Sequence, residues 1–204
     1  MPTLGDYEEI AFVPRIAIKF PLALPVPDGF DPVRLETWPK VEGRLEYVQG
    51  RLLYMPPCGD GQGRTVARVV TALGNWEHEH PEFVVSSNEV GILLGGNTRG
   101  ADAAAWRTRD LGPWSPGVAR VPPVLAVEVA GKDDTVEMLT EKAHWYLKHG
   151  VEVVWILVPA SRTVHVITKD GTTVVGTGAR VPSRPSLPGL DPLVDDLFGQ
   201  LSRP

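Results

Sequence analysis

Residues 122–158 of this 204-residue chain read PPVLAVEVAGKDDTVEMLTEKAHWYLKHGVEVVWILV, and this stretch decides the fold. Two continuous apolar runs, at 124–130 and 153–158, are typical of strands in a sheet that is covered on both faces. Between the two runs, apolar residues recur at three- and four-residue spacing, as in an amphipathic helix. A strand, a helix and a strand of this length predict a right-handed parallel crossover.

The helix of this unit has marked ends. We predict Asp133 or Asp134 as its N-cap, with Glu137 completing a capping box. Gly150 follows the last turn, as glycine commonly does after a helix. The predicted buried stripe comprises Val136, Leu139, Ala143, Tyr146 and Leu147. Lys142 lies at the border of this stripe, from which its side chain can reach a neighbouring strand.

One charged residue, Glu128, interrupts the first apolar run. Period-two alternation gives it small neighbours, Ala126 and Ala130, on its own face of the strand. Burying an ionised carboxylate is unfavourable unless a cation, a metal or hydrogen bonds compensate it, and Lys142 is a nearby candidate partner. From the residues alone, a metal site and a structural ion pair both stay open.

Composition narrows the class of protein. With 204 residues and 43% hydrophobic content, the chain is long enough for one domain with its own core. No apolar run approaches the roughly 20 residues that cross a bilayer, and the N-terminus lacks the layout of a signal peptide. The single cysteine, Cys58, excludes an intrachain disulfide and a multi-cysteine metal site, and no motif around it indicates a nucleophile. We therefore expect a cytoplasmic protein.

The charge of the chain argues against one class of function. A net charge of −5 and a pI of about 5.5 count against tight, sequence-independent DNA binding, which usually requires a basic domain. A local basic patch beside an acidic metal site stays open, and so do scattered, solvated charges. The residues available for such a patch are Arg64, Arg68, Arg99, Arg107, Arg109 and Lys132.

The N-terminal part predicts little regular structure. Seven prolines in the first 40 residues disfavour continuous elements, apart from one short edge strand over 15–20. A hairpin of strands 44–48 and 51–55 follows, because Gln49-Gly50 supplies a residue that tolerates the positive φ of a tight turn. Glu46 lies on its first strand.

The remaining elements are short strands and two helices. They are a helix over 64–78, strands over 83–86, 89–94 and 101–106, a hairpin of 162–168 with 172–175, and a short C-terminal helix that packs Leu193, Leu197 and Phe198. Asp102 is expected at the start of its strand, after the turn GGNTRG. The cluster His78-Glu79-His80 has no third metal ligand nearby in sequence, and histidines suit the dipole in the last turn of a helix.

The order of three residues resembles a known superfamily. Asp102 on one strand, Glu128 on the next and Lys142 on the following helix are similar to the metal-dependent nucleases of the PD-(D/E)XK superfamily. From about Trp38 to Phe198, the chain resembles more closely the Uma-type family of restriction-endonuclease-like proteins, a domain of unknown function. The motifs that carry this resemblance are RLEYVQGRL (44–52), Asp102, AVEVAGKDDT (126–135), TEKAHWYLKHGVEVVWILVPASRTV (140–164) and LPGLDPLVDDLF (187–198).

The resemblance implies an α/β fold. Its restriction-endonuclease-like domain would cover residues 38–204, with a mixed β-sheet core flanked by helices and a periphery rich in β-hairpins. Residues 1–37 would form a proline-rich extension. Two departures from the family pattern are Ala101, in place of a proline, and Gly131, in place of a serine.

The resemblance also implies a metal site. Asp102, Glu128 and the backbone carbonyl of Val129 would hold Mg²⁺ or Mn²⁺, since such hard cations take oxygen ligands. Lys142 would orient the attacking water or offset developing charge, although the superfamily's common form has its lysine at the position of Ala130. The further candidates are Glu46 as an additional acid, and Gln62, Arg64 and Lys132 as substrate-binding residues.

Three functions are compatible with residues of these types. The leading hypothesis is a nuclease that hydrolyses phosphodiester bonds in nucleic acid, with DNA favoured and a homodimer compatible with it. The alternative is a catalytically inactive module with the same fold that binds nucleic acid or a protein partner. A glycosidase that uses Asp102 and Glu128 as its acid pair is disfavoured, because it leaves Lys142 without a role.

Overall fold

One mixed sheet organises the chain. The computed structural model describes residues 20–55, 57–113 and 117–202, and among these residues nine strands pair into a single sheet. Its order is β1-β3-β2-β5-β6-β7-β8-β9, and β4 pairs with β5 outside this path. The strands are β1 (Leu22–Leu24), β2 (Arg44–Val48), β3 (Arg51–Met55), β4 (Phe83–Leu94), β5 (Asn97–Arg107), β6 (Leu125–Val129), β7 (Val153–Val158), β8 (Thr163–Thr168) and β9 (Gly171–Val175).

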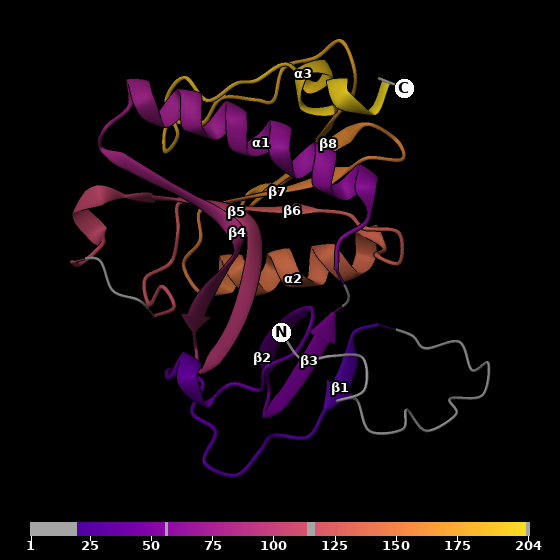
Figure 1. The fold of residues 1–204 in the computed structure, drawn as a ribbon. Coiled ribbons are helices and arrows are strands. Elements are labelled where there is room, and N and C mark those ends of the chain that lie inside the picture. Colours follow the sequence, from indigo (N-terminus) through magenta and orange to yellow (C-terminus); the bar gives the residue numbers. More distant parts are fainter. Residues whose placement is uncertain (1–19, 56, 114–116, 203–204) are drawn as a thin grey trace.

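Helices cover both faces of the sheet, as Figure 1 shows. They are α1 (Asp60–Glu79), α2 (Val136–Lys148) and α3 (Val194–Phe198), with 3-10 turns at Leu35–Thr37, Thr108–Asp110 and Gly199–Ser202. The first and third helices pack on one face, where Leu73 and Phe198 join a core with Val127. The second packs on the other face, where Ala143 joins a core with Ala126. The predicted α/β fold, a mixed sheet flanked by helices, is confirmed.

The predicted crossover is present. Strands β6 and β7 are parallel, with Glu128 paired to Ile156, and α2 connects them. The strand β7 has the predicted bounds, while β6 is one residue shorter at each end than the apolar run. On α2, the predicted stripe is buried at Leu139, Ala143, Tyr146 and Leu147.

The predicted N-cap of α2 is wrong. Thr135 caps the helix, since its hydroxyl accepts a hydrogen bond from the backbone N–H of Met138 at 3.2 Å. Asp134 instead accepts the N–H of Gly131 at 2.8 Å and closes the turn before the helix. The capping box with Glu137 is therefore also wrong, because the third residue after the cap is Met138. At the other end, Gly150 has φ 99° and follows the last turn as predicted.

The first hairpin matches the prediction. Strands β2 and β3 pair from Arg44–Met55 to Val48–Arg51, and the turn residues Gln49 and Gly50 have φ of 50° and 79°. Two successive positive φ values suit the twist of a two-residue hairpin. Strand β1 adds to β3 at the edge of the sheet. The strand predicted over 15–20 lies outside the described residues except for Phe20, which is in a bend.

Several predicted boundaries are wrong in the middle of the chain. The strands predicted over 83–86 and 89–94 form one strand, β4, interrupted by a bulge between Ser87 and Val90. The turn after it is only Gly95-Gly96, so β5 begins at Asn97 and Asp102 lies in its middle rather than at its start. Helix α1 begins four residues earlier than predicted, because its glycines continue the helix despite their low propensity.

The C-terminal third follows the prediction closely. Strands β8 and β9 form the predicted hairpin, with Gly171 as the first residue of β9 rather than in the turn. Leu197 and Phe198 of α3 are buried as expected. Leu193 is only half-buried, because it is the N-cap residue, and Val194 is the buried residue there instead. No helix in the described ranges is long and apolar enough to span a membrane.

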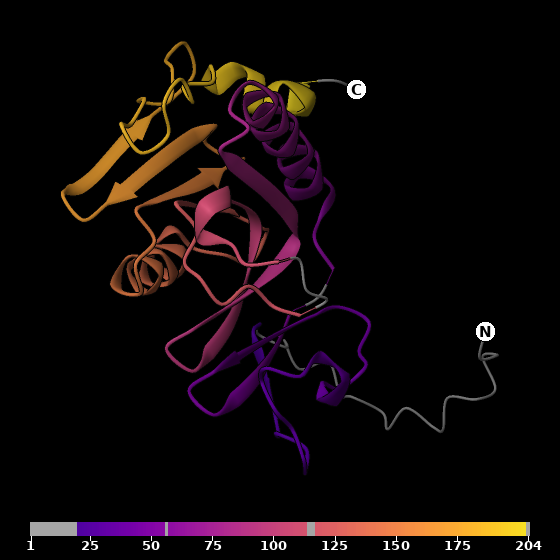
Figure 2. The same ribbon diagram turned by 90° about the vertical axis from the view of Figure 1, so that its left-hand side faces the viewer.

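The sheet splits along one edge of β5. Strand β4 pairs with β5 over its whole length, so the other partners of β5 must share its opposite edge. Strand β2 pairs there at Thr98, and β6 pairs there at Ala103–Ala105. Between these pairings, residues 99–102 face neither strand, and Figures 1 and 2 show the β2–β3 hairpin diverging from β6 at this point. The backbone groups that this segment directs to that edge, those of Gly100 among them, are therefore available to side chains.

Candidate active site

The ammonium group of Lys142 lies in the split and joins three strands. It contacts Glu46 Oε1 of β2 at 2.8 Å and Glu128 Oε2 of β6 at 3.0 Å. It also donates a hydrogen bond to the carbonyl oxygen of Gly100 in β5 at 2.7 Å. Two acids and one lysine, predicted from separate segments, thus form one buried ionic cluster.

Tyr146 holds the same cluster from the next turn of α2. Its hydroxyl group is 3.0 Å from Glu128 Oε1 and 3.1 Å from the carbonyl oxygen of Gly100. The backbone N–H of Gly100 donates to Glu46 Oε1 at 3.1 Å. Side chains thus bind the polar backbone groups of Gly100, which lies in the unpaired segment of β5.

Asp102 of β5 lies beside this cluster and binds the backbone of β6. Its Oδ2 accepts the backbone N–H of Val129 at 2.7 Å. The carbonyl oxygen of Val129 accepts a hydrogen bond from Gln62 Nε2 of α1 at 3.0 Å. Asp102, Glu128, Val129, Gln62, Glu46 and Lys142 all line one cavity of about 140 Å³. The structure therefore gathers all four predicted catalytic residues, the predicted carbonyl ligand and one of the predicted substrate-binding residues.

The carboxyl groups of this cavity are strongly perturbed. Burial, partly offset by the charge of Lys142, raises the pKa of Glu128 from 4.5 to about 7. Burial, together with the negative charge of Glu128 and then of Glu89, raises the pKa of Asp102 well above its usual value. A hydrogen bond between the carboxyl groups of Asp102 and Glu89 adds to this rise. Carboxyl groups with raised pKa values in one cavity are a mark of a functional site.

The pKa values of Lys142 and Tyr146, the two hydrogen-bond donors on α2, are raised as well. Burial by itself lowers the pKa of Lys142, but the charges of Glu128 and Glu46 outweigh it and raise that pKa well above its usual value. Burial, followed by the charge of Glu128, raises the pKa of Tyr146 well above 10. Lys142 therefore stays charged and Tyr146 stays neutral at any pH near 7.

Two site residues escaped the sequence reasoning, Arg44 and Glu89. They form an ion pair with each other, and Arg44 Nη1 also lies 4.0 Å from Asp102 Oδ1. Arg44 precedes Glu46 by two residues, so period-two alternation was a usable signal for it. Glu89 had no such signal, because the bulge in β4 sets its direction. Tyr146 was expected in the buried stripe, but its hydroxyl contact with Glu128 was not foreseen.

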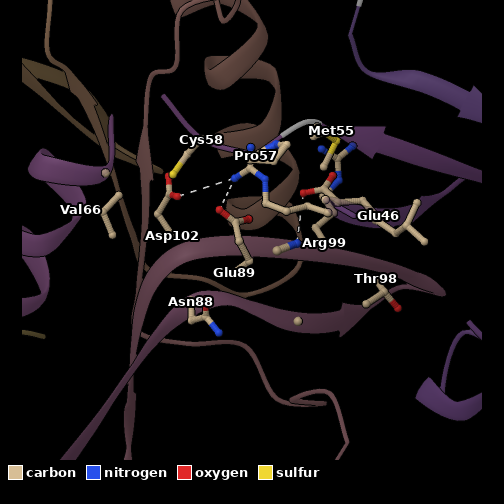
Figure 3. A pocket seen from close by; sticks show the side chains of 16 residues that line it. Glu46, Met55, Pro57, Cys58, Val66, Asn88, Glu89, Thr98, Arg99 and Asp102 are labelled. Carbon is tan, nitrogen blue, oxygen red and sulfur yellow. Dashed lines mark hydrogen bonds and ion pairs between the residues drawn. The ribbon is translucent and has the colours of Figure 1, made fainter. Parts of the chain in front are cut away.

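A larger cavity of about 630 Å³ adjoins the acids. Figure 3 shows Glu89 and Asp102 projecting into it from neighbouring strands, with Arg99 and Glu46 on its far side. Arg44, Glu46, Glu89, Arg99 and Asp102 line both this cavity and the smaller one, so the two cavities adjoin at the acids. Exposed Cys58 lines only the larger cavity.

Other predicted residues lie outside the two cavities. Arg64 ion-pairs with Asp60 on the surface of α1. Lys132 is exposed and lines a small adjoining hollow with Gln62. The remaining arginines of the postulated basic patch do not gather there, because Arg107 pairs with Glu152 and Arg109 lies next to Asp110. Arg99 is the exception, since it lines both cavities and stacks over Trp145 at 4.9 Å.

The donor set suits a hard divalent cation. Asp102, Glu128 and the Val129 carbonyl all offer oxygen atoms, which Mg²⁺ and Mn²⁺ prefer, and each has lone pairs beyond its present hydrogen bonds. Within the described part of the chain, however, no three His, Cys, Asp or Glu side chains are gathered as a ready metal cluster. The cations that neutralise the acids here are Arg44 and Lys142. The residues fit a metal, provided that the carboxyl groups adjust to it.

Comparison with known proteins agrees with this geometry. The model of the Uma2 family, described as "Putative restriction endonuclease", matches residues 32–195. A crystal structure of a "putative nuclease belonging to DUF820" from Anabaena variabilis ATCC 29413 has the same fold, with a TM-score of 0.73 at 20% sequence identity. The match covers 82% of this chain and 96% of that one. No curated protein sequence matches the chain.

Proposed function

This chain belongs to the Uma2 family, described as "Putative restriction endonuclease", and from that premise we propose that it is a divalent-metal-dependent nuclease that hydrolyses phosphodiester bonds in DNA. The observation that carries the proposal is the meeting of Asp102, Glu128 and Lys142 around one small cavity. They come from two adjacent strands and one helix, which hold them rigidly. A site on rigid elements keeps the positions that catalysis needs.

Asp102, Glu128 and the carbonyl oxygen of Val129 would hold the metal ion, Mg²⁺ or Mn²⁺. When bound, such an ion lowers the pKa of a coordinated water and offsets the charge that develops on the phosphodiester. Val129 contributes twice to this arrangement, because its N–H also fixes Asp102 Oδ2. Gln62, by binding the Val129 carbonyl, keeps that oxygen directed into the cavity.

Lys142 and Tyr146 prepare Glu128 for this role. Each binds one oxygen of its carboxyl group, so the side chain is held in a single orientation. The ammonium group of Lys142 is also the cation nearest to Glu128 that can donate to a phosphate oxygen or to the attacking water. Lys142 would therefore take part in the reaction, and Tyr146 would position the carboxyl group of Glu128.

The larger cavity supports a phosphodiester substrate. Arg44 and Arg99 line it together with Asp102, and guanidinium groups bind phosphate oxygens through paired N–H donors. Because the net charge is −5, DNA binding would rest on this local arrangement of a few cations, and each phosphate contact that they make adds to the salt dependence of binding. We propose DNA rather than another phosphodiester as the substrate because the family is described as "Putative restriction endonuclease".

The test is calorimetric titration of Mn²⁺ into wild type and Asp102→Asn, followed by a DNA cleavage assay. Asparagine keeps an acceptor for the Val129 N–H but loses the charge, so we expect the same fold and Mn²⁺ binding weaker by at least about tenfold. Wild type should cleave DNA only with Mg²⁺ or Mn²⁺. The control is Asp110→Asn, an aspartate in the 3-10 turn that follows β5, which should match wild type.

One outcome favours the alternative. If wild type binds no Mn²⁺, the metal-dependent nuclease is contradicted, and Arg44 and Lys142 are the permanent counter-ions of the acids. The chain would then be the catalytically inactive module with this fold. Cleavage that persists in Asp102→Asn would mean that the reaction takes place at another site.

A further inference from the structure

Strand β4 is distorted where it passes the acids. Its pairing with β5 shifts between Ser87 and Val90, and the two residues in the bulge, Asn88 and Glu89, have φ of 62° and 56°. A residue with a side chain rarely adopts this left-handed conformation, because its Cβ atom crowds the backbone. Bulges are common next to active sites, where they redirect a side chain.

The side chain redirected here is that of Glu89. Its carboxyl group pairs with Arg44 and lies beside Asp102, and Figure 3 shows both acids projecting into the larger cavity. Gly100 permits this approach, since a Cβ atom at that position would lie 3.0 Å from Glu89 Oε2. A bulge on one strand and a glycine on the next thus bring a third carboxyl group to the acids.

Arg44 is the cation that this group meets. Its guanidinium pairs with Glu89 and lies 4.0 Å from Asp102 Oδ1. Its Nε atom is buried and has no hydrogen-bond partner within residues 20–55, 57–113 and 117–202. A buried donor without an acceptor is unfavourable, so this guanidinium is incompletely satisfied where it lies. It neutralises the same carboxyl groups that a divalent cation would neutralise.

We propose that Glu89 is a third carboxylate of the metal site and that Arg44 is a resident cation which the metal displaces from it. This inference rests on the proposed metal-dependent function. Displacement would leave the guanidinium of Arg44 free at the border of the larger cavity, where a phosphate group of the substrate can accept its hydrogen bonds. Arg44 would thus exchange one anionic partner for another when metal and substrate bind.

The test compares the dissociation constants of Mn²⁺, measured by calorimetry, for wild type, Glu89→Gln and Arg44→Gln. Loss of a ligand should weaken Mn²⁺ binding in Glu89→Gln by at least about tenfold, because even outer-shell partners commonly contribute that much. Loss of the competing cation should tighten Mn²⁺ binding several-fold in Arg44→Gln. The two substitutions therefore act in opposite directions, although the residues form one ion pair.

Two matched controls separate displacement from a general effect of charge. Asp134→Asn removes an acid from the same small cavity and keeps an acceptor for the Gly131 N–H. Arg99→Gln removes a guanidinium that lines the same two cavities. Both controls should change the Mn²⁺ dissociation constant less than the matching test substitution.

The outcomes distinguish this inference from the proposed function. If wild type binds no Mn²⁺, both are overturned. If wild type binds Mn²⁺ and Glu89→Gln binds it equally well, or Arg44→Gln binds it more weakly, only the inference made here is overturned. Should Arg44→Gln fail to fold, Arg44→Met serves instead, since methionine also fills part of the space but carries no charge, and it should tighten binding in the same direction.

Discussion

Replacement of Lys142 by methionine is expected to lower the free energy of unfolding by about 3–5 kcal/mol at pH 8, which is the cost of breaking a buried ion pair by removal of one partner. The methionine is similar in length and fills the space but carries no charge. Glu46 and Glu128, each with a side chain about 6% exposed, would lose the ammonium group that both contact. The carbonyl oxygen of Gly100 would lose one of its donors as well.

Urea denaturation of the two proteins at pH 8 measures this loss. The matched control is Lys148→Met, an exposed lysine in the last turn of the same helix, which should change the free energy of unfolding by less than about 1 kcal/mol. The loss in Lys142→Met should shrink at pH 5, where Glu128 is protonated and needs no counter-ion. A loss no larger than that of Lys148→Met would show that the cluster contributes no net stability.

Replacement of Glu128 by glutamine is expected to abolish function and yet stabilise the metal-free protein at pH 8. Glutamine resembles the protonated glutamic acid, so Lys142 can still be bound by the amide oxygen and Tyr146 by the amide nitrogen. Loss of a metal ligand should lower metal-dependent cleavage by at least about a hundredfold. The same change removes a negative charge that lies close to Glu46 in a buried site.

The stabilisation follows from the sign of the pKa shift. The pKa of Glu128 is about 7 in the folded protein, mainly because of burial, against an ordinary value of 4.5. A raised pKa means that the native state binds the proton of Glu128 more tightly than the unfolded state does. The stability that this proton contributes is complete below pH 4.5 and is lost as the pH rises through 7. At about 1.4 kcal/mol for each pKa unit, the loss approaches about 3 kcal/mol by pH 8.

Urea denaturation in the presence of a chelator tests this prediction at pH 4.5 and pH 8. Glu128→Gln should match wild type at the lower pH and exceed its free energy of unfolding by about 1–3 kcal/mol at the higher one. The control is Glu141→Gln on the exposed side of α2, which should leave the pH dependence of wild type unchanged. A Glu128→Gln protein less stable than wild type at pH 8 would contradict the unfavourable burial of this charge.

Local sequence patterns predicted the elements that carry the site. The apolar runs around 124–130 and 153–158 identified β6 and β7, since strands covered on both faces leave no polar alternation. Three- and four-residue spacing placed Lys142 and Tyr146 on one side of α2, and Gln49-Gly50 identified the first hairpin. These features depend only on residues a few positions apart, which explains why they could be predicted.

The ends of helices and strands were predicted less well, because neighbouring residues compete for the same position. Thr135 competes with Asp133 and Asp134 for the N-cap, and only the hydrogen bond of Asp134 to Gly131 removes the aspartate from that role. The sequence GGNTRG suggested a long turn, yet Gly95-Gly96 suffices and the rest joins β5. In both places several residues suit the same position, so propensity alone cannot choose.

The sequence by itself determined the crossover and the hairpins, because backbone periodicity and turn chemistry are set between near neighbours. Its resemblance to the family indicated the acids and the lysine of the candidate site. Only the tertiary structure decided which charges meet. The split in the sheet beside Gly100 brings Glu46 to Lys142, and the bulge in β4 turns Glu89 toward Arg44. The energy of a buried charge depends on all the charges and dipoles around it, and those come from strands that are far apart in the chain.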